Sequence, residues 1–146
     1  MAATFTATGY NATPRVQPSG ALSAQVFNFS YAGRSASVSD VIYIGRLQAN
    51  NVRVVDGWLT GKPGSDASCT WKVGIPGNDV FFTPAAISIT TSGNTRFSGL
   101  ATAYPKTPSL SADAEGLLYV PIIVTKSTGT STATGSLQLV LITQQL

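Results

Sequence analysis

Alternation of apolar and polar side chains recurs along much of the chain and predicts β-strands. It runs through residues 25–31, 52–59, 68–75 and 137–142. A period of two residues places one set of side chains in a core and the other on the opposite face, as in a half-buried strand. Apolar runs at residues 41–44 and 117–125 are too short for helices and predict further strands, with Pro121 indicating an edge position or a bulge in the second.

Turn residues separate these segments at intervals of about 8 to 12 residues, which is typical of antiparallel β-proteins. Shorter strand candidates lie at residues 80–82, 86–89 and 95–97, and only residues 109–114 could form a helical turn. No repeat of 20 to 50 residues is present. We therefore predict an all-β fold: an antiparallel β-sandwich, a jelly roll of about eight strands.

The first 22 residues have a different character. Isolated apolar residues stand among Ala, Thr, Gly and Asn, the first charge is Arg15, and Pro14 and Pro18 disfavour a helix. We predict an extended N-terminal arm over residues 1–22 and a β-sandwich domain over residues 23–146. Such an arm could be a disordered terminus, or it could become ordered against a neighbouring subunit.

Composition narrows the classes of function. The chain has 146 residues, of which 43% are hydrophobic, 10% are charged and 34 are Ser or Thr, with a net charge of +3 and no histidine. Its nine Lys and Arg residues are scattered singly, which argues against nucleic-acid binding. Without histidine, Ser-His-Asp catalysis and His-based zinc sites are impossible. We expect no enzyme activity, no cofactor and no bound metal.

Several residues could nevertheless carry chemistry. Asp113 and Glu115, with Asp66 or Asp79 nearby, could bind calcium or form an acid pair, but isolated surface carboxylates are most often simply solvated. The lone Cys69 shares a face with Trp71, so we expect it to pack in the core rather than react.

Targeting signals are also not expected. The N-terminus lacks a basic region followed by an apolar run, so we expect no signal peptide. The longest apolar runs, at residues 117–124 and 137–142, are far shorter than the roughly 20 residues of a membrane helix. We expect a chain made and kept in a cytoplasm, without a membrane partner.

Strand and turn segments across residues 22–143 resemble the head decoration, or cement, proteins of tailed bacteriophages. The +3 net charge departs from that class, whose members are often acidic. The segments that carry the resemblance are Asp40-Val41-Ile42-Tyr43-Ile44-Gly45-Arg46-Leu47 with Val52 and Val54 after it, Thr70-x-Lys72-Val73-Gly74 before a turn, Tyr119-Val120-Pro121-Ile122, and Thr134-Gly135-Ser136-Leu137.

The resemblance implies a jelly-roll subunit on the outer surface of a virion, assembled in the cytoplasm of a bacterial host. It would form a homodimer or homotrimer and stabilise the capsid by bridging neighbouring copies of the major capsid protein. Low charge suits a surface given to protein neighbours. We expect the arm to contact the capsid, through Phe5, Tyr10, Arg15 and Val16.

A second hypothesis is a carbohydrate-binding sandwich of a phage fibre or adhesin. An exposed aromatic ring would then stack on a sugar. The candidates are Tyr31, Tyr43, Tyr104 and Trp58. Aromatic residues in strands are more often core or cross-strand partners, which favours the first hypothesis.

Overall fold

The structure is a computed structural model of the whole chain, and it describes residues 3–12, 20–30, 37–48, 52–61, 69–83, 86–88, 96–97, 104, 106, 111–112, 118–129 and 136–145. Within these residues no helix is long and apolar enough to cross a membrane. The strands are β1 (Thr4–Thr6), β2 (Leu22–Ser30), β3 (Val41–Gln48), β4 (Val52–Gly61), β5 (Thr70–Gly74), β6 (Ile87–Ser88), β7 (Ser111–Ala112), β8 (Leu118–Thr128) and β9 (Ser136–Gln145).

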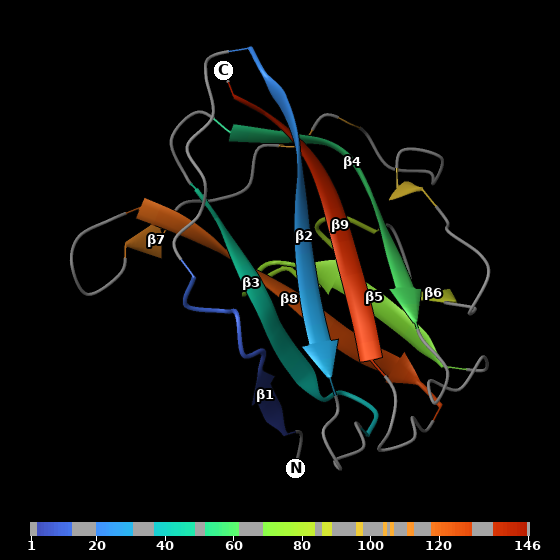
Figure 1. Cartoon of the computed structure of the whole chain (residues 1–146). Helices are drawn as coiled ribbons and strands as arrows, with labels where there is room; N and C mark the ends of the chain where they lie inside the picture. The colour runs from blue at the N-terminus through green and yellow to red at the C-terminus, as the bar shows by residue number, and fades with distance from the viewer. Residues whose placement is uncertain are drawn as a thin grey trace.

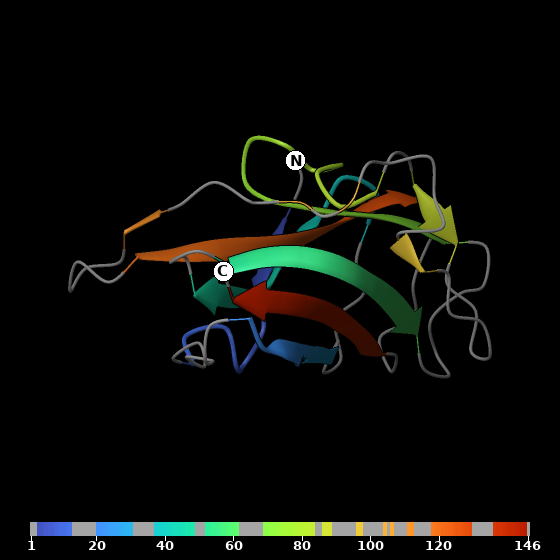
Figure 2. The same ribbon diagram turned by 90° about the horizontal axis from the view of Figure 1, so that it is seen from above.

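Two sheets pack face to face (Figures 1 and 2). One sheet has the order β1-β3-β8-β5-β6, with β7 also paired to β8, and the other has the order β2-β9-β4. The long strands pair antiparallel as β2 with β9 and β3 with β8, and then β4 joins β9 and β5 joins β8. An antiparallel ribbon that alternates in this way between two sheets is a jelly roll, so the predicted sandwich is confirmed.

The core lies between the sheets and follows the alternation predicted from the sequence. Its largest fully buried side chains include Trp71, Phe82 and Phe97, and Cys69 is buried with them as expected. The sheets approach closely at Gly45. A Cβ atom added there would lie 2.1 Å from Cδ1 of Phe27, so the Phe27 ring already occupies that space. A larger residue at Gly45 would therefore push the two sheets apart.

Pro121 lies in an interior strand, in register with Arg46 of β3. On the other side of β8, β5 ends where Gly74 meets Ile123, and β7 begins its pairing at Tyr119. Among the described residues, Pro121 thus falls between the segments that pair with this side of β8. A proline lacks an N–H donor, so it is tolerated at such a gap in the ladder.

Candidate interaction surface

The beginning of the chain lies against its own sandwich. Strand β1 pairs parallel with β3, and the Phe5 ring packs edge-on against Phe29, with a centroid distance of 6.0 Å. Ala7 is buried in the core cluster, and its N–H donates to the Tyr43 carbonyl at 2.9 Å. Residues 3–12 of the expected arm are therefore anchored within the subunit. The division between an arm over residues 1–22 and a domain over residues 23–146 stays a prediction.

Tyr10 and Arg46 hold the next turn of this segment on the outer side of the same sheet. The Tyr10 ring meets Tyr43 edge-on at 5.6 Å. Arg46 donates from Nε to the Tyr10 carbonyl at 3.0 Å and from Nη2 to the Asn11 carbonyl at 2.6 Å. Its guanidinium also lies 4.8 Å from the centre of the Tyr119 ring. Arg46 thus fastens residues 10 and 11 to β3.

The four predicted contact residues are placed differently. Phe5 is half-buried against the core, and Tyr10 is half-buried in the Arg46 cluster. Burial raises the pKa of the Tyr10 hydroxyl, with a smaller contribution from neighbouring Tyr119. Arg15 and Val16 lie outside the described residues. The exposed residues of the segment beside Tyr10 are Thr8, Gly9, Asn11 and Ala12.

We expect Arg46→Ala to release residues 8–12 from the sheet. It removes two charge-assisted hydrogen bonds to carbonyls and two cation–π contacts, with the Tyr10 and Tyr119 rings, at a cost of about 1 kcal/mol for this partly exposed group. Hydrogen exchange should become faster at the Tyr10 and Ala12 amides. Arg53→Ala, which removes hydrogen bonds to the Gln144 side chain, is the control; equal exchange in both variants would contradict the anchoring role.

The aromatic residues considered for sugar stacking have partners within the subunit. Arg96 covers Trp58 at 4.9 Å and pairs with Asp56 at 2.9 Å, and Tyr43 contacts Tyr10. Tyr104 donates its hydroxyl to the Phe82 carbonyl at 2.6 Å. Tyr31 lies outside the described residues. These contacts leave the described rings less available for a planar sugar-binding platform.

Tyr104 gives a pH-dependent prediction. Burial, and then repulsion from the Asp56 carboxylate, raise the pKa of its hydroxyl well above the usual value. Above a pH of about 10 the unfolded chain ionises this tyrosine while the folded chain does not, so stability falls as pH rises, by up to about 1 kcal/mol per pH unit. Tyr104→Phe should reduce this slope in urea unfolding between pH 9 and 11. An unchanged slope would contradict the assignment.

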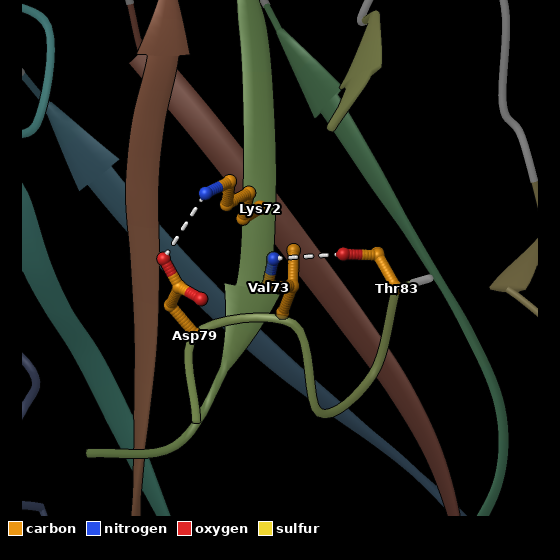
Figure 3. Close-up of polar contacts among 4 residues, drawn as sticks. All are labelled: Lys72, Val73, Asp79 and Thr83. Atoms are coloured by element: carbon orange, nitrogen blue, oxygen red, sulfur yellow. Dashed lines mark hydrogen bonds and ion pairs between the residues drawn. The ribbon is translucent and has the colours of Figure 1, made fainter. Parts of the chain in front are cut away.

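The acidic candidates do not form a metal site among the described residues. Asp66, Asp113 and Glu115 lie outside them, and no group of three or more potential ligands occurs in the described part. Asp79 instead pairs with Lys72 at 3.3 Å, in the turn that follows β5 (Figure 3). The N–H of Val73 in β5 donates to the hydroxyl of Thr83 beyond this turn, so the segment after the turn folds back along β5.

A buried lysine was missed by sequence reasoning. Lys126 lies on the core face of β8, where its ammonium group donates to the Cys69 sulfur at 3.2 Å and sits 5.3 Å from the centre of the Trp71 ring. The signal was present, because Lys126 continues the alternation of Val120, Ile122 and Val124. The arrangement is buried away from solvent and serves the core rather than an accessible site.

Comparison with known proteins gives a fold-level relationship. No protein-family model matches the chain, and no curated protein matches it. A chain in the solved capsid of Ralstonia phage GP4 aligns with a TM-score of 0.64 and 19% identity, covering 99% of both chains. A chain in the cyanophage Pam1 capsid asymmetric unit aligns with a TM-score of 0.55 and 14% identity, covering 95% of both. This protein therefore shares its complete fold with chains found in two phage capsids.

Proposed function

We propose that this protein is a structural component of a bacteriophage virion, and that it decorates the outer surface of the capsid. One observation carries the proposal: the entire jelly roll, from end to end, matches a chain of a phage capsid, at 99% coverage of both chains. A fold alone does not define a function, so the surface has to be compatible with the role. Its low charge suits contact with other proteins, because the cores of protein interfaces are depleted in charged residues.

The mechanism we propose is bridging without catalysis. The sandwich provides a rigid body, and the segment at residues 8–12 lies on its surface, held by Arg46. If this body contacts two neighbouring copies of the major capsid protein, separating them requires breaking both contacts. Many weak contacts repeated over a symmetric shell stabilise it strongly, because each bound copy raises the effective concentration of the next contact.

The test uses capsids of the phage that encodes this chain, produced without the protein. Purified protein should co-sediment with these capsids and raise the temperature at which they release DNA. Failure to bind, or binding that leaves the release temperature unchanged, would overturn the bridging role. A glycan array addresses the carbohydrate hypothesis, and we expect no binding on it.

Surface variants locate the contact. Thr8→Arg combined with Asn11→Arg adds bulk and charge at two exposed positions beside Tyr10, and should reduce capsid occupancy. Asn78→Arg places the same side chain on the exposed turn after β5 and should leave occupancy unchanged. Equal occupancy for both variants would show that the N-terminal segment does not contact the capsid. The role in the virion is tested separately, by the binding of the wild-type protein to capsids.

A further inference from the structure

Strand β2 lies at one edge of its sheet and, among the described residues, lacks the usual protection of an edge strand (Figure 1). Within the described residues, β9 is the strand with which it pairs. It is nine residues long, contains no charged residue and no proline, and keeps a regular register with β9 throughout. Edge strands normally carry charges, proline or bulges, or are short, because an unprotected edge pairs readily with another strand.

The other described edges are short or covered. On the far side of β4, backbone bridges join Val54 to Lys106 and Trp58 to Arg96. The same strand is bulged between Val54 and Asp56, and Asp56 pairs with Arg96. In the other sheet, which contains β3, β8 and β5, the terminal strands are short: β1 has three residues and β6 has two. In the part of the chain that the structure describes, β2 is therefore the long edge strand without protection.

Alternation of the backbone identifies which groups face outward from β2. The Gln145 N–H donates to the Ala21 carbonyl, and the Gln145 carbonyl accepts from the Gly20 N–H. The backbone N–H and C=O groups of odd-numbered residues from Ala21 onward therefore point toward β9. The even-numbered residues from Leu22 to Ser30 direct their N–H and C=O groups away from it. Their side chains are exposed, including Leu22 at 65% and Val26 at 51%. The edge thus combines hydrogen-bonding groups with exposed apolar side chains.

The surface beside this edge is hollow. A groove of about 690 Å³ is lined by Val26–Ser30 of β2 and by Thr8, Gly9 and Ala12 of the N-terminal segment, together with Ile44 of β3 and Ser136 and Leu137 of β9. The groove is therefore bounded by the edge strand and by the anchored N-terminal segment. It provides space beside β2 into which another extended strand can enter.

We propose that a second copy of this chain pairs through β2, antiparallel about a two-fold axis at Val26. Val26 would face Val26 of the second copy, Ala24 would face Asn28, and Leu22 would face Ser30. An uncharged strand meets itself without placing like charges opposite each other, which favours self-pairing over a partner recognised by charge. The contact is closed by symmetry, so it produces a dimer joined by one continuous sheet.

This dimer goes beyond the proposed capsid role and is tested without capsids. Sedimentation of the purified 146-residue chain should show a species of twice the 15.1 kDa monomer mass. Val26→Lys places two ammonium groups opposite each other at the axis and should raise the dissociation constant at least about tenfold. Val38→Lys, at a position that is 53% exposed outside β2, is the control and should leave the mass unchanged.

A disulfide between two copies tests the pairing through β2 independently, in case Val26→Lys fails to fold. In the proposed register the two Val26 Cα atoms form a hydrogen-bonded pair, about 5.5 Å apart, which lies within the range of Cα separations that a disulfide spans. Val26→Cys should form a covalent dimer on oxidation, whereas Val38→Cys should not. A monomer at all concentrations, a trimer, or a dimer unaffected by both Val26 variants would overturn the proposal. A monomer that needs Val26 to bind capsids would also overturn it, while leaving the capsid role in place.

Discussion

Trp71→Ala should reduce the free energy of unfolding by about 4 kcal/mol, measured by urea denaturation. Trp71 is fully buried in β5 and is the largest side chain in the core. Its removal leaves a cavity that the rigid strands cannot close, and it takes the aromatic ring away from the Lys126 ammonium group. Because a domain of this size is stable by about 5 to 15 kcal/mol, this variant should be close to unfolding.

Trp71→Phe is the matched control. The indole N–H of Trp71 is buried and has no hydrogen-bond partner among the described residues. Phenylalanine removes that polar group while keeping most of the ring, so the expected loss is only about 1 to 2 kcal/mol. Equal losses for the two variants would show that this position tolerates a cavity and would contradict the packing argument.

Asp40→Ala should cost about 2 kcal/mol and should detach the start of the chain. Asp40 is buried immediately before β3, where Oδ1 accepts from the Ala3 N–H at 2.6 Å and Oδ2 accepts from the Ser37 N–H at 2.7 Å. Bonds to a charged acceptor are stronger than neutral ones. Their loss should destabilise the pairing of β1 with β3, which hydrogen exchange at Phe5 and Ala7 would detect.

Asp79→Ala is the control for Asp40→Ala. It also removes a carboxylate, but one that does not hold the start of the chain. Asp79 pairs with Lys72 on the surface, where its side chain is 42% exposed. Exposed ion pairs contribute little, so we expect a change below about 0.5 kcal/mol and no faster exchange in β1. If Asp40→Ala behaved like Asp79→Ala, the buried carboxylate would not be anchoring the N-terminal strand.

The strands and their core faces could be predicted from local patterns. The alternation of Cys69, Trp71 and Val73 is seen in the structure as a buried face, and the predicted strand at residues 137–142 lies inside the longer β9. These predictions succeeded because burial between two sheets imposes a period of two on each strand. The sandwich followed from the number and spacing of such strands.

Features that depend on contacts between distant segments could not be predicted in the same way. The segment at residues 3–12 has weak patterning, and it is held by Asp40 and Arg46, more than 30 positions later in the chain. Gly74 falls within the predicted strand at residues 68–75, and a Cβ there would lie 2.2 Å from the Asn78 carbonyl oxygen. The anchoring of this segment and the need for glycine at position 74 depend on residues that meet only in the folded chain.

Placement of the N-terminal segment changes how its role should be tested. Deleting the first residues would remove Ala7 from the core cluster, and Phe5, which packs against that cluster, along with any capsid contact. Reduced binding by a truncated chain would then report lost stability as well as lost contact. Substitutions at exposed positions such as Thr8 and Asn11 avoid this ambiguity, because their side chains lie outside the core.

The most direct test of the capsid role is an electron cryomicroscopy reconstruction of capsids assembled with and without this protein. We predict additional density on the outer surface that fits the jelly roll and touches two neighbouring copies of the major capsid protein. Density confined to the interior or to the tail, contact with a single capsid subunit, or no difference between the two reconstructions would contradict the account.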